Sequence, residues 1–206
     1  MSQYFQIHPD NPQAHLLQQA AEIVRHGGVI AYPTDSCYAL GCQPGEKEAL
    51  ERIQRLRRLD DHHNLTLVCR DLSEIATYAK IDNSAYRLLK ALTPGPYTFL
   101  LKATNEVPRR LQHRKRRTIG IRVPDHRITH ALLELLDAPL MSTTLRLPDA
   151  ELPLHDPESI RDQLGHALDL VIDGGVCGIE PTTVVDMTRD PPEVVRAGLG
   201  DTALFT

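Results

Sequence analysis

The segment 27–42, which reads GGVIAYPTDSCYALGC, constrains this chain more than any other. Its glycine pair is expected to end a helix, and the apolar run 29–32 that follows predicts a short buried strand. The turn 33–36, Pro-Thr-Asp-Ser, then places small oxygen-bearing side chains at the carboxyl end of that strand. Ligands of open α/β sheets bind at this end of the strands. An ordinary strand and turn would give the same pattern, so the other segments must decide between the two interpretations.

Length and composition predict one globular domain. The 206 residues can form one sizeable core, and the fractions of hydrophobic residues (41%) and charged residues (24%) are those of a soluble protein. No run approaches the ~20 apolar residues that span a bilayer, and residues 1–6 lack the regions of a signal peptide. We therefore expect a single domain over residues 1–206, a cytoplasmic location and no membrane partner.

Cysteine and histidine positions do not indicate a metal centre. The sequence has no CxxC motif among its four cysteines, Cys37, Cys42, Cys69 and Cys177. Its ten histidines are scattered along the chain, apart from one adjacent pair. Because neither pattern has the spacing of metal ligands, we expect free thiols and no protein-bound metal.

Charge is distributed unevenly, although the net charge is only −4. Residues 1–148 carry 20 Lys and Arg against 15 Asp and Glu, whereas residues 149–206 carry 3 against 12. A basic run is often only a solvated face, but two clusters together favour a surface that attracts phosphate groups. The clusters are Arg52, Arg55, Arg57 and Arg58, and then Arg109, Arg110, Arg114, Lys115, Arg116 and Arg117.

Hydrophobic periodicity predicts alternating helices and strands. Helices are expected over 16–24, 47–58, 72–78, 84–92, 128–136 and 157–166, with caps at Asn11, Asp71, Asn83 and Asp156. Strands are expected over 29–32, 65–69, 97–101, 118–124, 139–144, 170–172, 182–187 and 194–196. This alternation predicts an α/β or α+β fold in which helices pack against a sheet.

Several segments, in order and spacing, resemble the YrdC/YciO domain. They are 27–42, then 93–99 (TPGPYTF), then 118–124 (TIGIRVP) with 142–144 (STT). The tail is also similar to this family in 180–186 (EPTTVVD) and 194–198 (VVRAG). The resemblance covers nearly the whole chain and implies a twisted, open mixed sheet with flanking helices and a concave basic cavity.

The resemblance also implies a function. The best-known activity of the family makes threonylcarbamoyl-AMP from L-threonine, bicarbonate and ATP with Mg²⁺, at the start of the threonylcarbamoyladenosine modification of tRNA. Some members were described as double-stranded RNA binders. We therefore expect ATP or AMP, with L-threonine or threonylcarbamoyl-AMP, as ligands, and Mg²⁺ only as the partner of ATP.

Carried over residue by residue, the resemblance implies a set of binding residues. Thr34 and Ser142 would contact the substrate, and Arg122 would hold the threonine carboxylate with its planar guanidinium. Thr118, Arg196 and Asn64 would lie near the nucleotide. From the residues alone, Thr34 is equally a turn former, Ser142 a strand-end hydroxyl, and either arginine a member of an ion pair.

The chain departs from the synthase pattern at two pairs. The Lys-x-Arg pair falls on Arg57 and Leu59, or on Arg58 and Asp60 after a one-residue slip, and the Ser-x-Asn pair falls on Thr144 and Arg146. Arg57, Arg58 and Thr144 are therefore the candidate catalytic residues. Losing one pre-placed donor costs about 2.7 to 4 kcal/mol of transition-state stabilisation, so we expect little synthesis from ATP.

These departures resemble the YciO branch and leave three interpretations open. The protein is a nucleotidyltransferase-like enzyme or a hydrolase that acts on an acyl- or carbamoyl-adenylate, or it binds double-stranded RNA or tRNA, or it is a scaffold without chemistry. Few aromatic residues are available for base stacking, so RNA would be bound through its shape and phosphates. The RNA-binding candidates are Arg114, Lys115, Arg116 and Arg117.

Overall fold

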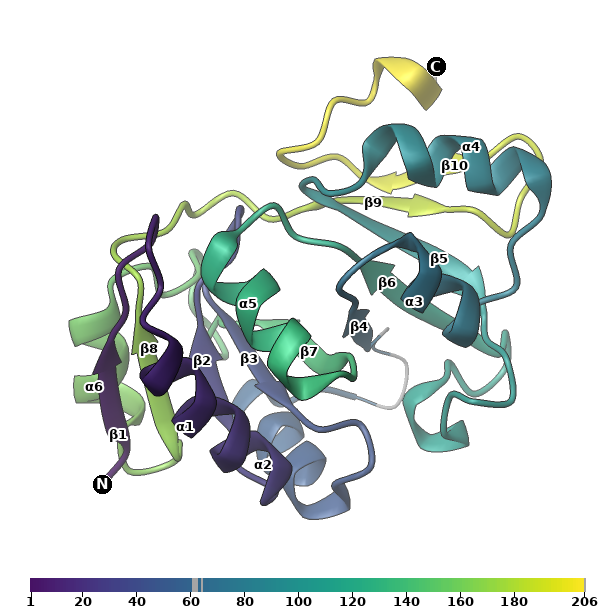
Figure 1. Ribbon diagram of the computed structural model, residues 1–206. Helices are drawn as coiled ribbons and strands as arrows, with labels where there is room; N and C mark the ends of the chain where they lie inside the picture. The colour runs from purple at the N-terminus through teal and green to yellow at the C-terminus, as the bar shows by residue number, and fades with distance from the viewer. Residues whose placement is uncertain (61–62, 64, 206) are drawn as a thin grey trace.

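A computed structural model describes residues 1–60, 63 and 65–205 of the chain. Within these residues, ten strands form one mixed sheet in the order β1-β8-β2-β3-β7-β4-β6-β5-β9-β10 (Figure 1). The predicted mixed sheet with flanking helices is therefore confirmed.

The elements are short. The strands are β1 Gln3–Gln6, β2 Ile30–Tyr32, β3 Ala39–Cys42, β4 Thr66–Val68, β5 Tyr97–Lys102, β6 Thr118–Arg122, β7 Leu140–Thr144, β8 Leu170–Asp173, β9 Thr183–Asp186 and β10 Glu193–Arg196. The helices are α1 Ala14–Arg25, α2 Lys47–Arg57, α3 Leu72–Tyr78, α4 Asn83–Leu92, α5 Arg127–Leu136 and α6 Pro157–Leu164, with 3₁₀ turns η1 Arg109–Leu111 and η2 Ala203–Phe205.

Parallel and antiparallel pairs alternate irregularly across the sheet. The pairs β1–β8, β2–β8, β4–β6 and β5–β9 are parallel, and the other neighbours are antiparallel. Strand β4 lies between parallel β6 and antiparallel β7, so Thr66 is level with Gly120 on one side and with Ser142 on the other. This register determines which side chains meet on the face of the sheet.

The two faces of the sheet have separate cores. On the first face, α2, α3, α4 and α6 contribute Ile53, Ile75, Leu89 and Ile160 to one large apolar cluster. On the second face, α1 and α5 lie side by side and pack against a smaller cluster (Figure 1). The strand residues of this smaller cluster come, within the described chain, from β2, β3, β4, β7 and β8. Strands β5, β6 and β9 therefore have a second face that these helices do not cover.

Alternation along the strands explains both cores, because successive side chains of a strand point to opposite faces. Ala31 of β2 lies in the first core, whereas Ile30 and Tyr32 lie in the second. A strand buried on both faces reads as a continuous apolar run, as the segment 29–32 does.

Some local predictions were wrong. Asn83 was expected to cap α4, but Asp82 is the cap and accepts the Ala85 backbone N–H at 2.8 Å. Helix α1 begins at Ala14 after Gln13 rather than after a cap at Asn11. The predicted caps Asp71 and Asp156 are confirmed, since each accepts a backbone N–H of its helix.

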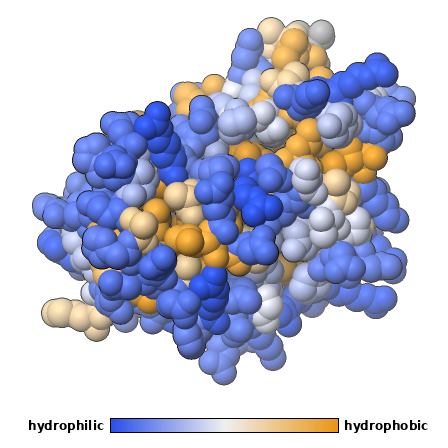
Figure 2. All heavy atoms as spheres, viewed as in Figure 1, coloured by the Kyte–Doolittle hydropathy of each residue, from blue (hydrophilic) through white to orange (hydrophobic). Residues whose placement is uncertain are grey.

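Figure 2 shows one face of the molecule, which is mostly hydrophilic. Apolar side chains are visible around the C-terminal segment at the upper right, a region in which Val195, Leu199 and Leu204 are exposed. Among the described residues, no helix combines the length and the hydropathy needed to cross a bilayer.

Candidate functional site

The turn after β2 is held together by one hydroxyl group. Thr34 Oγ1 accepts the backbone N–H groups of Ser36 and Cys37 at 3.1 and 3.2 Å and donates to the Cys37 carbonyl at 2.6 Å. Thr34 is only 4% exposed. Its hydroxyl therefore stabilises the turn, as the alternative interpretation of this residue predicted.

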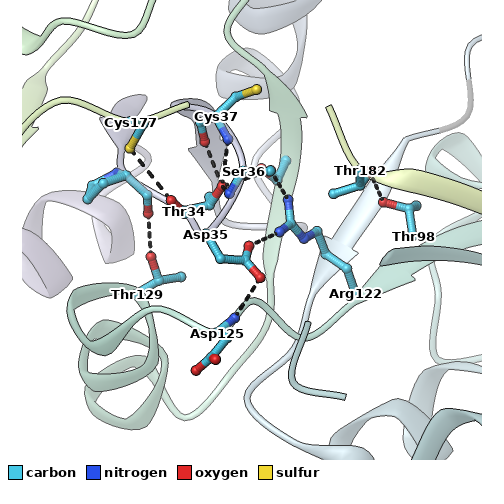
Figure 3. Close-up of polar contacts among 12 residues, drawn as sticks. Thr34, Asp35, Ser36, Cys37, Thr98, Arg122, Asp125, Thr129, Cys177 and Thr182 are labelled. Carbon is cyan, nitrogen blue, oxygen red and sulfur yellow. Dashed lines mark hydrogen bonds and ion pairs between the residues drawn. The ribbon is translucent and has the colours of Figure 1, made fainter. Parts of the chain in front are cut away.

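Arg122 extends from the end of β6 to the same turn (Figure 3). Its guanidinium forms an ion pair with Asp35 and donates to Ser36 Oγ at 3.3 Å. Asp35 also accepts the backbone N–H of Asp125 at 3.0 Å. The side chains of Arg122 and Asp35 are 9% and 10% exposed, so this is a nearly buried pair that ties the turn to β6.

Ser142 and Thr118 are also buried. Ser142 Oγ donates to the Leu40 carbonyl at 3.0 Å and shares a hydrogen bond with the hydroxyl of Tyr32. Burial raises the pKa of Tyr32 to about 12, so that hydroxyl stays protonated. Thr118 is paired with Lys102 of the neighbouring strand β5.

The segment 174–182 lies against the turn. Cys177 Sγ is 3.6 Å from the Thr34 carbonyl, and Cys37 Sγ is 3.3 Å from the Glu180 carbonyl. Neither thiol forms a disulfide bond. Burial raises the pKa of the Cys37 thiol and raises that of the Cys177 thiol to about 11. These contacts separate the turn from solvent.

An open cavity of about 500 Å³ lies beside this buried network, where β7 ends and β4 begins. We call it the arginine cavity. Three groups of side chains line it. They are the threonines Thr66, Thr98, Thr143, Thr144 and Thr182, the charged or titratable residues Arg57, Arg146, Arg196, His63 and Glu151, and apolar residues that include Leu100, Leu152, Ile179 and Val195.

The floor of the arginine cavity is a row of residues in register across three strands. Leu100 of β5 is level with Gly120 of β6, which is level with Thr66 of β4. A Cβ atom at Gly120 would lie 2.8 Å from Thr66 Oγ1 and 3.4 Å from the Thr98 methyl group. The missing side chain therefore allows these two threonines to approach each other.

Three arginines converge on the arginine cavity. Arg57 donates to the carbonyl of Arg146, and Arg196 Nη2 donates to the Thr182 carbonyl at 2.8 Å. Within the described chain, no carboxylate forms an ion pair with any of the three. Burial and then the charge of Arg146 lower the pKa of both Arg57 and Arg196. This local excess of positive charge favours an anionic ligand.

One further donor in the arginine cavity has no partner. The Nε atom of Arg57 is buried and makes no hydrogen bond to the described residues. Partial burial and then the charge of Arg57 lower the pKa of His63, with Asp60 opposing and Arg196 adding to the effect. His63 is therefore largely neutral at neutral pH.

The structure separates the residues that the resemblance grouped together. Arg57, Thr144 and Arg196 line the arginine cavity, whereas Thr34, Thr118, Arg122 and Ser142 do not. Arg58 also lies outside it: this residue ends α2 with a positive φ of 47°, and its side chain is 72% exposed and bonded to Asp149 at 3.1 Å. Asn64 lies outside the described residues. Arg114, Lys115, Arg116 and Arg117 are exposed on the segment before β6.

Sequence reasoning missed several lining residues. Thr66, Thr98 and Thr182 were not proposed, and neither were His63 and Glu151. Strand alternation carried a signal for Thr66 and Thr98, because each precedes a core residue and so had to face away from the first core. Among the described residues, no three His, Cys, Asp or Glu side chains are grouped as metal ligands.

Comparisons with known proteins agree with the fold. A family model named Sua5/YciO/YrdC, described as telomere recombination, matches residues 22–198. The YciO protein of Escherichia coli strain K12 is 60% identical over 205 residues, covering 100% of both chains. A crystal structure of E. coli YciO, also covering 100% of both chains, has a TM-score of 0.97.

Two further relatives carry more specific names. A threonylcarbamoyl-AMP synthase of Chromobacterium violaceum is 39% identical over 137 residues, which are 66% of this chain and 70% of the relative. The crystal structure of P. abyssi Sua5 complexed with L-threonine is 25% identical with a TM-score of 0.87, over 95% of this chain and 57% of that chain.

Proposed function

Because this chain belongs to the Sua5/YciO/YrdC family, we propose that it binds a nucleotide or adenylate in the arginine cavity and acts on threonylcarbamoyl-AMP or a similar mixed anhydride. The observation that carries this proposal is the convergence of Arg57, Arg146 and Arg196, for which the described chain supplies no carboxylate partner. The phosphate of an adenylate supplies the missing negative charge. Relatives named threonylcarbamoyl-AMP synthase support this choice of ligand.

Each group of lining residues has a role in this proposal. The three arginines hold the phosphate, and the hydroxyls of Thr66 and Thr144 donate to its oxygens. Exposed apolar residues on the rim, such as Val195, pack against the base. Where the bound nucleotide is ATP, Mg²⁺ would enter with it and be held mainly by the phosphates, since Glu151 is the one carboxylate among the described lining residues.

Threonine recognition by Arg122 stays a prediction, together with the roles of Thr34, Thr118 and Ser142. One observation supports it. The Nε atom of Arg122 is buried without a hydrogen-bond partner in the described chain, so this donor is available to a ligand carboxylate. The P. abyssi relative was crystallised with L-threonine, which supports this class of ligand.

The reaction is expected to start from a preformed adenylate. Synthesis requires a carbamate oxygen to attack the α-phosphate of ATP and to expel pyrophosphate, so negative charge accumulates at phosphorus. Leu59 stands where the synthase pattern has an arginine, so one donor to that charge is absent. Hydrolysis makes a smaller demand, because one water cleaves the anhydride and releases AMP and the carbamate.

Calorimetric titration with AMP tests binding. Arg57→Gln and Arg196→Gln are each expected to weaken binding about tenfold, because a charged hydrogen bond contributes about 1.5–3 kcal/mol. Arg55→Gln is the matched control, since Arg55 is an exposed arginine of α2 that bonds to Glu51 of its own helix. Equal affinities for all three variants, or no AMP binding by the wild type, would contradict the proposal.

Turnover assays separate the possible reactions. The protein is incubated with threonine, bicarbonate and MgATP while pyrophosphate is measured, and separately with threonylcarbamoyl-AMP while AMP is measured. We expect faster AMP release than pyrophosphate release. Pyrophosphate formation at a comparable rate would show that Leu59 does not limit synthesis, and no release of either product would reduce the proposal to binding alone.

A second candidate function rests on the exposed basic segment 114–117. Its side chains can contact the phosphates of double-stranded RNA or tRNA without reading bases, and such a complex weakens steeply as salt rises. Changing Arg114, Lys115, Arg116 and Arg117 to glutamine is expected to abolish binding of duplex RNA at low salt. Binding that survives this change, or that ignores salt, would exclude this function.

A further inference from the structure

A second cavity, of about 490 Å³, lies at the carboxyl ends of β4 and β6. We call it the crevice. One wall is the segment 70–72 directly after β4, and the other is the segment 123–127 directly after β6. Lys90 of α4 and Pro94 also line it. Among the described residues, the crevice and the arginine cavity share no lining residue, and they lie at opposite ends of β4.

The topology of the sheet favours a ligand at this position. Strands β4 and β6 are parallel neighbours. After β4 the chain enters α3, whose Ile75 packs in the first core, and after β6 it enters α5, whose Ile128 packs in the second core. Neighbouring parallel strands whose connections leave to opposite faces open a crevice at their carboxyl ends, where ligands of open α/β sheets bind.

The floor of the crevice is apolar, whereas its rim carries positive charge. Leu72, Val123 and Pro124 contribute apolar surface. On the rim, Lys90 forms no ion pair with the described residues. Among the same residues, the side chain of Arg127 donates only to the Asp10 carbonyl, at 2.8 Å. Their charges are therefore not neutralised by a bonded carboxylate.

Two other charged residues of the crevice, Arg70 and Asp71, already have partners within the protein. Arg70 pairs with Asp71 at 3.1 Å and with Asp137 at 3.3 Å. Asp71 also caps α3. The one other carboxylate among the described lining residues is that of Asp125, whose residue is exposed at the rim. Within the part of the chain that the structure describes, Lys90, Arg127 and Asp125 therefore have no ion-pair partner, which leaves two positive charges against one negative charge in the crevice.

His126 supplies an unused polar atom. This residue lines the crevice, and its Nδ1 atom is buried without a hydrogen-bond partner in the described chain. Burial lowers the pKa of His126, against the charges of Asp35 and Asp125, so a neutral imidazole is available as donor or acceptor. Buried polar atoms of folded proteins normally have a partner.

We propose that the crevice is a second ligand site, which takes a small organic anion with an apolar body. Lys90 and Arg127 hold its carboxylate or phosphate group, and Leu72, Val123 and Pro124 contact the body. The volume lies in the range of about 300–1,000 Å³ that is usual for small-molecule sites. This site is independent of the function proposed for the arginine cavity.

Titration of the ¹⁵N-labelled protein with phenyl phosphate, followed by NMR, tests this site. Saturable amide shifts are expected in segments 70–72 and 123–130. Benzyl alcohol, which has a similar body without the charge, is expected to bind at least about tenfold more weakly, since one charged hydrogen bond is worth that much. Absence of saturable shifts in these segments, or equal affinity for the two probes, would overturn the proposal.

Variants identify the charges. The double change Lys90→Gln and Arg127→Gln is expected to weaken phenyl phosphate binding at the crevice by about tenfold or more. The matched control changes Lys80 and Arg87, which are also exposed, to glutamine and is expected to leave the affinity unchanged. Unshifted amide signals elsewhere verify the fold, and Lys90→Gln alone gives a milder test. Equal affinity of the test and control variants would overturn the proposal.

The two proposals fail separately. Phenyl phosphate can also enter the arginine cavity, where amides of residues such as Thr66 and Thr98 report it. Arg57→Gln is expected to weaken only the binding that the amides around those threonines report. Absence of AMP binding by the wild-type protein, with phenyl phosphate shifts still present at the crevice, would refute the proposed function and leave the second site standing.

Discussion

The arginines of this protein occupy two contrasting environments. Arg122 is nearly buried, and its charge is matched by the carboxylate of Asp35. Arg57, Arg146 and Arg196 line an open cavity, and their described partners are carbonyl groups or each other's charge. The charge of Arg122 is matched without a ligand, although its Nε atom has no hydrogen-bond partner in the described chain, whereas the charges of the cavity arginines are unmatched. The difference indicates that the ion pair of Arg122 stabilises the fold, while the cavity arginines have charge available for an anionic ligand.

The largest expected change in stability follows from breaking the buried ion pair between Arg122 and Asp35. Asp35→Ala removes the partner of Arg122 and is expected to lower the free energy of unfolding by about 3–5 kcal/mol, because an unpaired charge is left buried. Asp149→Asn removes the charge that pairs with the exposed Arg58, keeps a residue type that tolerates the positive φ of 63° at this position, and is expected to cost about 0–1 kcal/mol. Urea denaturation of both variants measures the contrast. Similar losses would show that burial does not distinguish the two pairs.

A smaller effect is expected on the floor of the arginine cavity. Gly120→Ala places a methyl group 2.8 Å from Thr66 Oγ1 and 3.1 Å from the Leu65 carbonyl, and is expected to cost about 1–3 kcal/mol of unfolding free energy. It should also weaken AMP binding by narrowing the space. Gly45→Ala is the control, since its Cβ would meet no atom within 4 Å. Thermal unfolding and calorimetry together check both consequences.

A modest pH effect is expected at His63. Partial burial and Arg57 lower its pKa, and a bound phosphate would raise that pKa by adding negative charge nearby. Binding then takes up a proton. The AMP affinity of the wild type, divided by that of the His63→Gln variant, should therefore increase as the pH falls below neutrality. The comparison with this variant removes the titration of AMP itself. Parallel pH profiles would show that His63 does not sense the ligand.

The smallest expected change in stability is that of an arginine in the arginine cavity. Arg57→Gln loses a hydrogen bond to the Arg146 carbonyl but relieves repulsion from the Arg146 charge, so its unfolding free energy should change by no more than about 0.5 kcal/mol. Denaturation of this variant, which is expected to bind AMP poorly, separates binding from stability. A loss as large as that of Asp35→Ala would mean that the arginine cavity is also needed for folding.

Much of the fold followed from local patterns in the sequence. The helices and most strands were predicted because their apolar residues recur with the period of each structure, as in α2 and β6. Strands β1 and β3 were missed. β1 is a short edge strand, and β3 follows the polar turn directly and is buried along its whole length, so neither shows a distinct alternation.

The site was less accessible to sequence reasoning. Resemblance grouped Arg122 with Arg196, but only three-dimensional pairing shows that Asp35 neutralises the former. Thr66 meets Gly120 through a register between strands that are distant in the sequence. Arg146, which stands where the synthase pattern has an asparagine, lines the arginine cavity. Local sequence patterns do not predict contacts between residues that are far apart in the chain.

The three-residue strand β4 has a consequence for how this protein can change. Thr66 faces the arginine cavity, while the next residue, Leu67, is buried in the first core. Since neighbouring positions serve different faces, substitutions at Thr66 or at Thr98 of β5 can alter the preferred ligand and leave the core packing intact. Directed evolution of new specificities should therefore begin on this floor, where a library of variants would still contain many folded proteins.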